Sequence, residues 1–250
     1  MAGQLAAIAA ARLSPDTEQD YGVAEAGLGD ATLPAAVDLR RDWLPIADQG
    51  RTASCVGWTV ADSLVRWHLV EAKQLAPDEP LSARYVWMAA KEMFQREAFP
   101  STFLETDGTS LKAGLDVVRK FGVALERELP WDGFVTTDHE TFNRDARRRR
   151  IVHYYNLRND PHEWRRWLHQ SGPVAVLVHE DAGFQTTTGE LTAFDPETAD
   201  GSHAAALYGY TEDHFLLRSS WGTDWGDAGY ARLTPEYAAD AILESYGVMV

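Results

Sequence analysis

The sequence contains a single cysteine, Cys55, so no disulfide can form within the chain. One cysteine also excludes zinc and iron–sulfur sites built from several thiolates. Because secreted proteins of this size often carry disulfides, a chain without them is more typical of a reducing compartment. The first fifteen residues lack the basic stretch of a signal peptide, and Arg12 interrupts their only apolar run. We therefore expect a cytoplasmic protein.

Positively charged residues are also few. Lysine and arginine number 23 against 38 acidic residues, which gives a net charge of −15. Such a chain repels phosphate backbones and anionic lipid surfaces, so we expect neither nucleic acid nor a membrane as partner. No apolar run reaches the ~18–20 residues that a membrane span needs. The sequence has no phosphate-binding glycine motif and no metal-ligand spacing, and we expect no cofactor and no metal.

What the sequence does contain is an ordinary globular composition over 250 residues, enough for one large domain or two packed lobes. Residues 1–33, rich in Ala, Gly, Asp and Glu, form an N-terminal extension. Helical periodicity follows at 54–72, 81–94 and 110–121. Short β-prone runs come later, at 151–157, 174–179, 204–209, 214–218 and 229–233, with one helix at 161–170. Helices before strands indicate an α+β fold with a helical lobe at 34–145 and a β-rich lobe at 146–250.

Cys55 follows a loop and lies at the start of the helix predicted over 54–72. The positive end of a helix dipole favours the thiolate, which is the nucleophilic form, whereas burial in apolar surroundings opposes it. A nucleophile needs a base, and His203 is the best placed of the eight histidines. It opens a small-residue run at 204–207, which suits a strand whose first residue faces a cleft. These features alone leave open that Cys55 is inert core filler.

Five ordered segments of the chain, within about residues 33–246, resemble the papain-like cysteine peptidases, most closely their bacterial, disulfide-poor branch. Gln49 and Cys55 are six positions apart, as in that family, in the segment VDLRRDWLPIADQGRTASC. The other segments are LSARYVW, DGTSLKAGLDVVRKFGVALERELPW, SHAAALYGY and RSSWGTDWGDAGYARL. His203 lies 148 residues after Cys55. The family's histidine lies ~130–150 residues after its cysteine, in agreement with this spacing.

The resemblance implies a two-lobe papain-like fold, with Cys55 at the N-terminus of the central helix in the helical lobe and His203 in a β-barrel-like lobe. An extended peptide or protein substrate would bind in the cleft between the lobes. In the family's reaction the cysteine thiolate attacks the peptide carbonyl and forms a thioacyl-enzyme. His203, resting as an imidazolium beside the thiolate, would serve as acid and then as base. The Gln49 side chain and the backbone N–H of Cys55 would form the oxyanion hole.

The same resemblance assigns the residues that bind substrate. The backbone of Gly108 would hydrogen-bond the substrate main chain. Thr109, Ser110 and Ala204 would line S2, the pocket for the second residue on the acyl side of the scissile bond. Trp221 would shield the catalytic pair from water. Because none of these positions is charged, we expect a small or apolar substrate residue in S2.

Ser219 stands where the family has the asparagine that orients the histidine. Serine is one carbon shorter, so we expect its contact with His203 to be lost or to run through water, with a loss of rate. Val56 and Ser202 also depart from the family pattern. These departures keep a second hypothesis open, a catalytically weak papain-fold module that binds peptides. A third hypothesis is a peptide ligase or transferase that uses the same acyl-enzyme.

The extension of residues 1–33 is too short for the helical propeptide domain of the family. Three roles are compatible with its sequence: a short leader, a linker, or an autoinhibitory strand that lies in the cleft. The sequence sets neither the oligomeric state nor the physiological substrate.

Overall fold

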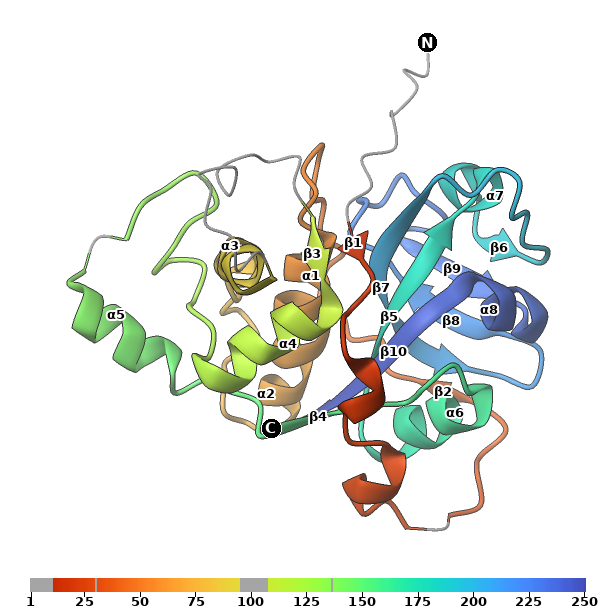
Figure 1. The fold of residues 1–250 in the computed structure, drawn as a ribbon, viewed down its shortest axis with the longest axis horizontal. Helices are drawn as coiled ribbons and strands as arrows, with labels where there is room; N and C mark the ends of the chain where they lie inside the picture. The colour runs from red at the N-terminus through yellow and green to blue at the C-terminus, as the bar shows by residue number, and fades with distance from the viewer. Residues whose placement is uncertain (1–10, 30, 95–107, 136) are drawn as a thin grey trace.

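The computed structural model describes residues 11–29, 31–94, 108–135 and 137–250. A helical part and a sheet-rich part lie side by side (Figure 1). The helices of the first part are α1 (Cys55–Trp58), η3 (Thr59–Arg66), α2 (Trp67–Glu71), α3 (Ala83–Phe94), α4 (Leu111–Lys120) and α5 (His139–Ala146). α1, η3 and α2 form one continuous rod with a π-helical middle, which confirms the helix predicted over 54–72. α3 and α4 confirm the next two predicted helices, whereas α5 was not predicted.

The sheet-rich part is built from strands β4 (His153–Asn156), β5 (Val174–Glu180), β6 (Glu190–Leu191), β7 (Gly201–Tyr210), β8 (Phe215–Arg218), β9 (Tyr230–Leu233) and β10 (Ile242–Met249). Its helices are α6 (Pro161–Gln170), α7 (Ala182–Thr186) and α8 (Pro235–Ala241). The strand order is β4-β10-β5-β7-β8-β9-β6. β4, β5, β7, β8, β9 and α6 confirm the predicted runs, whereas β10, between β4 and β5, was not predicted.

The strand pairing adds two details to the expected papain-like arrangement of lobes. Within the described residues it forms an open path with β4 and β6 at its ends, and no pairing joins those two strands. In addition, β2 (Val37–Asp38) pairs with β7, at Tyr210 and Gly209. The sheet therefore includes residues from the stretch that the sequence assigned to the helical lobe.

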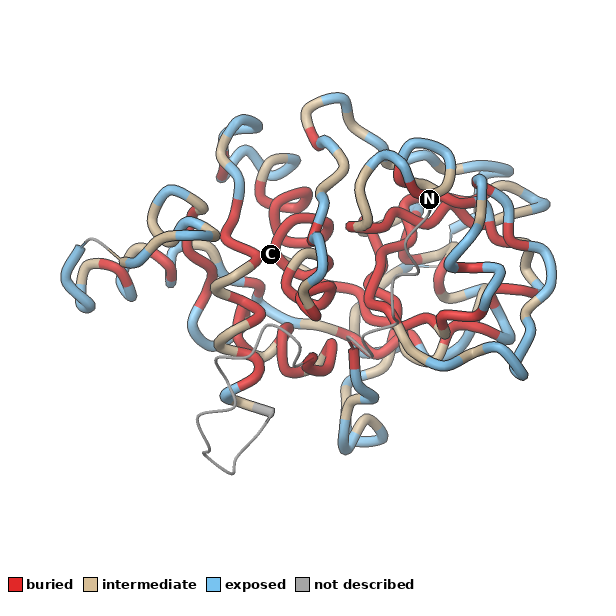
Figure 2. The backbone as a smooth tube through the Cα atoms, turned by 90° about the horizontal axis from the view of Figure 1, so that it is seen from above, coloured by how far each residue is buried: buried red, intermediate tan, exposed pale blue. Residues whose placement is uncertain are grey.

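The central helical rod is packed so deeply that every residue of η3 is buried, including the charged ones. Asp62 accepts hydrogen bonds from Arg66 and from Arg218 of β8, each at 2.9 Å. Arg218 also donates to the Ser63 hydroxyl and to the carbonyl of Pro45. Because a buried charge without a partner is strongly destabilising, this network fixes the rod against the sheet. Figure 2 shows buried residues inside both parts and along the junction between them.

The N-terminal segment, residues 11–29, runs along that junction (red in Figure 1). It contains β1 (Ala11–Arg12) and two short 3-10 turns, η1 (Thr17–Gln19) and η2 (Val23–Ala26). β1 pairs in parallel with β3 (Thr109–Ser110), which leads into α4. Farther along, the backbone N–H of Asn156 in β4 donates to the carbonyl of Tyr21 at 2.8 Å. The segment therefore binds to both parts of the fold.

Candidate active site

Cys55 is the first residue of α1 and is fully buried. The turn before it is held by the Thr52 hydroxyl, which donates to the carbonyl of Gln49 at 2.8 Å. On the opposite side, the backbone of Ala204 in β7 lies close enough to the sulfur to lower the thiol pKa by hydrogen bonding. Ala204 is the residue after His203. The predicted nucleophile therefore lies where α1 packs against β7, the strand that carries the predicted base.

His203 lies in β7, opposite Val178 of β5, and is also fully buried. Its Nε2 atom is 3.1 Å from the Ser219 hydroxyl oxygen. The expectation that this contact is lost or runs through water is therefore wrong, because the antiparallel pairing of β7 with β8 brings the short serine side chain directly against the ring. The Trp221 ring covers His203 at a centroid distance of 4.7 Å. The other ring nitrogen, Nδ1, is buried and makes no hydrogen bond within the described residues.

Besides the bond from the Thr52 hydroxyl to its carbonyl, three further hydrogen bonds fix Gln49 in the turn before Cys55. Its backbone N–H donates to the carbonyl of Ser220 at 2.8 Å, and its side-chain oxygen accepts from the Ser220 hydroxyl at 2.7 Å. Its side-chain nitrogen donates to the carbonyl of Thr52 at 2.8 Å. An amide nitrogen carries two N–H groups, so one remains for a substrate oxygen. Ser220 was not predicted as a site residue, although it directly follows Ser219 in the matched segment.

Burial controls the charges of Cys55 and His203. Desolvation raises the pKa of the Cys55 thiol to about 12, and the nearby Glu180 carboxylate adds to this rise. Desolvation lowers the pKa of His203 to about 3. Burial therefore outweighs the helix N-terminus, and the structure favours a neutral thiol and a neutral imidazole in place of the expected thiolate–imidazolium pair.

The predicted substrate-binding residues are covered by the chain itself. Gly108, Thr109, Ser110 and Ala204 are all buried, and Trp221 is partly exposed. Ala11 lies in register with Thr109, and its carbonyl accepts a hydrogen bond from the Ser202 hydroxyl at 2.9 Å. Ser202 is adjacent to His203 in β7. The N-terminal segment thus connects the two strands between which the resemblance places the substrate.

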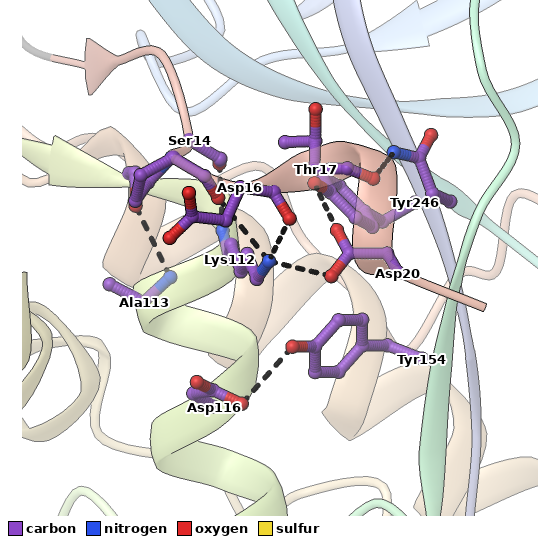
Figure 3. A network of polar contacts seen from close by, with 12 residues as sticks. Ser14, Asp16, Thr17, Asp20, Lys112, Ala113, Asp116, Tyr154 and Tyr246 are labelled. Atoms are coloured by element: carbon purple, nitrogen blue, oxygen red, sulfur yellow. Dashed lines mark hydrogen bonds and ion pairs between the residues drawn. The ribbon is translucent and has the colours of Figure 1, made fainter.

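Lys112 of α4 holds this segment in position (Figure 3). Its ammonium group pairs with Asp20 at 2.6 Å and donates to the carbonyls of Pro15 and Asp16 at 3.2 and 2.9 Å. The Asp20 side chain is only 6% exposed, and it also accepts a hydrogen bond from the Tyr246 hydroxyl at 3.0 Å. A lysine ammonium has three donors, and all three have partners in the segment.

Residues 33–249 match the family described as "Papain family cysteine protease". The chain belongs to this family. Among solved structures, the fold of this chain is similar to that of Xylellain, a cysteine protease from Xylella fastidiosa, at a TM-score of 0.74. The two chains are 21% identical, and the match covers 96% of this chain and 94% of that one. It is also similar to digestive procathepsin L2 from Tenebrio molitor, at a TM-score of 0.75 and 19% identity over 97% and 78% of the two chains.

Curated papain-family relatives are similarly distant. The chain is 24% identical to "Probable cysteine protease RD21C" of Arabidopsis thaliana over 82% of this chain and 44% of that protein. It is 25% identical to "Cathepsin L-like peptidase" of Aedes aegypti over 80% and 59% of the two proteins. The chain therefore spans about half the length of these relatives. The similarity to Xylellain is consistent with the bacterial branch that the sequence resembles.

Two further properties of the described part of this papain-family chain concern ligands and membranes. In the resolved stretches, no group of three or more His, Cys, Asp and Glu side chains is arranged to hold a metal ion. None of the helices described here is both long enough and apolar enough to cross a bilayer.

Lys112 and Glu180, which flank the site, were not predicted, because nothing in their local sequence links them to Cys55.

Proposed function

We propose that the chain is a cysteine-type peptidase that hydrolyses peptide bonds through a thioacyl-enzyme on Cys55. The observation that carries this proposal is the setting of His203. Its Nε2 atom is held by Ser219, its Nδ1 atom is free of hydrogen bonds within the described residues, and the next residue contacts the Cys55 sulfur. A base that is fixed through one nitrogen and open at the other suits proton exchange with a neighbouring thiol.

The reaction would proceed in two halves. His203 takes the proton of Cys55, and the sulfur attacks the peptide carbonyl while the backbone N–H of Cys55 and the free amide N–H of Gln49 stabilise the oxyanion. The protonated His203 gives its proton to the leaving amine, and the thioester remains. His203 then takes a proton from water, whose hydroxyl attacks the thioester. The carbon–sulfur bond breaks, the carboxylic acid leaves, and His203 returns its proton to the Cys55 sulfur, which regenerates the thiol.

We further propose that the N-terminal segment keeps this peptidase in a blocked form. β1 pairs with β3 and so engages the backbone groups of that strand. Ser202, which is adjacent to His203, donates a hydrogen bond to the carbonyl of Ala11. A substrate needs the same backbone groups and the same space. Lifting the segment would also let water reach Cys55 and His203, which removes much of the desolvation that keeps both groups neutral. Of the three roles compatible with the extension, this arrangement favours the autoinhibitory one.

The test is proteolysis of casein, an unstructured protein, by the full-length chain and by Lys112→Met, with new N-termini counted by mass spectrometry. We expect little cleavage by the unchanged chain and clear cleavage by Lys112→Met. Adding Cys55→Ser or His203→Ala to Lys112→Met should abolish that cleavage. Equal background cleavage in all variants would refute the peptidase and favour the peptide-binding module. Products joined to an added amine in place of hydrolysis would identify the ligase or transferase.

A further inference from the structure

Glu180, the last residue of β5, has a carboxylate in a position that the reaction above does not use. The residue is 3% exposed, and its carboxylate has no hydrogen bond and no ion pair within the described part of the chain. A buried carboxylate without a partner is unfavourable, because desolvation opposes its charge. Burial, together with the charge of Asp200, raises the pKa of Glu180 to about 7. Such a group is retained at a cost in stability, which is typical of functional sites.

The position of Glu180 relative to His203 is defined by strand register. Glu180 pairs with Gly201 and Val178 pairs with His203, so Glu180 lies two residues along from the partner of His203. Side chains two residues apart in a strand share a face and are separated by about 7 Å. A Cβ atom on Gly201 would lie 3.6 Å from a carboxylate oxygen of Glu180, which places the carboxylate over that glycine.

The strand order also tells which half of the substrate would reach Glu180. Ala204, the predicted S2 residue, pairs with Leu177, on one side of His203. Glu180 and Gly201 lie on the other side. If S2 holds a residue of the acyl half, as the family resemblance implies, the side that carries Glu180 receives the leaving-amine half.

We propose that Glu180 selects substrates with lysine or arginine directly after the scissile bond, by pairing its carboxylate with their cationic side chain. This proposal rests on the proposed peptidase function. Gly201 has no side chain, so β7 leaves the carboxylate uncovered at this register. The N-terminal segment binds Ser202, the residue after Gly201, through the carbonyl of Ala11. A substrate cation would supply the partner that the described residues do not.

The neighbouring charges favour the same substrates. Asp200 adds negative potential at Glu180, and the chain carries a net charge of −15. An acidic residue at the same substrate position would meet two carboxylates. Hydrogen bonds that involve a charged group are stronger than neutral ones, so we expect at least a roughly tenfold preference for lysine over an uncharged side chain of similar length.

The experiment uses full-length Lys112→Met and pairs of peptides from a library, identical except for lysine or norleucine after the scissile bond. We expect kcat/KM to be about tenfold higher for the lysine peptides. Glu180→Gln should bring the ratio of kcat/KM between the lysine and norleucine peptides close to one. Glu190→Gln, which changes an exposed carboxylate in β6 of the same part, should keep the preference. A ratio near one before the change, or a ratio that Glu180→Gln leaves intact, would overturn the proposal.

A binding arm separates this proposal from the peptidase itself. Affinities of the same peptide pairs are measured for full-length Lys112→Met that also carries Cys55→Ser, with and without Glu180→Gln. If no peptide is cleaved by the chain with Cys55, the peptidase function fails, and a lysine preference in binding that Glu180→Gln removes would still support the role of Glu180. If the peptides are cleaved and neither arm shows a lysine preference, the role of Glu180 fails alone.

Discussion

Replacing Lys112 by methionine should release the N-terminal segment and expose Cys55. The change removes the ammonium that pairs with Asp20 at 2.6 Å and its two bonds to segment carbonyls. It leaves the Asp20 carboxylate, 6% exposed, with the Tyr246 hydroxyl as its remaining partner in Figure 3. Removing one partner of a buried ion pair costs about 3–5 kcal/mol. That cost disappears when the segment lifts and Asp20 meets water, so it shifts the equilibrium towards the open form.

The expected change in the labelling rate of Cys55 follows from the low reactivity of its thiol when the segment is bound. At pH 8 a thiol with a pKa of about 12 is ionised in only roughly one molecule in 10⁴, so closed molecules react very slowly. Labelling therefore proceeds through open molecules, at a rate proportional to the opening equilibrium. A shift of about 3–5 kcal/mol corresponds to roughly 200- to 5,000-fold faster labelling, until opening itself becomes limiting.

Iodoacetamide labelling followed by intact-mass spectrometry measures this rate without ambiguity, because Cys55 is the only cysteine. The matched control is Lys120→Met on the same helix, where the lysine is 44% exposed and pairs with Asp116. The control should label within about threefold of the unchanged chain, since exposed pairs contribute little. Thermal melts of all three proteins exclude global unfolding as the cause. If folded Lys112→Met labels at the unchanged rate, the segment does not control access to Cys55.

Three further predictions follow from the buried polar groups. Arg218→Met breaks a buried ion pair and should destabilise the fold by about 3–5 kcal/mol, with a large drop of Tm in a calorimetric scan. Arg232→Met, at an exposed ion pair, should change Tm little. Equal shifts of Tm would contradict the burial argument. Ser219→Ala leaves Nε2 of His203 buried without a partner, so denaturant titration should show a loss of about 1–3 kcal/mol in the free energy of unfolding. Peptidase activity should also fall. Unchanged stability and activity would argue against the contact. Because the folded-state pKa of Glu180 is raised to about 7 from 4.5, its protonation favours the fold below pH ~4.5 and that contribution is lost as the pH rises through 7. Glu180→Gln should therefore gain up to roughly 3 kcal/mol over the unchanged chain at pH 8 and little at pH 4.5, and a gain that is equal at both pH values would count against the carboxylate as its cause.

The elements that sequence predicted best are those with a strong local pattern. The rod that begins at Cys55 has apolar residues at helical spacing, and the strand of His203 is a run of small and apolar residues. β10 was missed because Glu244, Ser245 and Gly247 interrupt its apolar pattern, although it lies in the interior of the sheet. Its place there depends on pairing with β4 and β5, which local sequence does not report.

The candidate site likewise contains residues that the sequence predicted and features that it did not. Cys55, His203 and Gln49 stand in segments whose order and spacing resemble the papain family, and the structure brings their surroundings together. The neutral state of the pair was not predictable, because it depends on the burial of both side chains, which local sequence does not report. Lys112 was equally invisible, since its partners lie in residues 14–20 and its own helix reads as an ordinary amphipathic one.

The contacts of the N-terminal segment also set an order of events during folding. The Ser14 N–H donates to Glu244, 230 residues later, and the Tyr246 hydroxyl of the same strand, β10, donates to Asp20. Contacts this distant in sequence form late, because a long loop must close first. Glu244 and Tyr246 both belong to β10. The N-terminal segment can therefore make these contacts only once β10 has joined the sheet. In the proposed peptidase, the cover over the active site would thus form together with β10, among the last steps of folding.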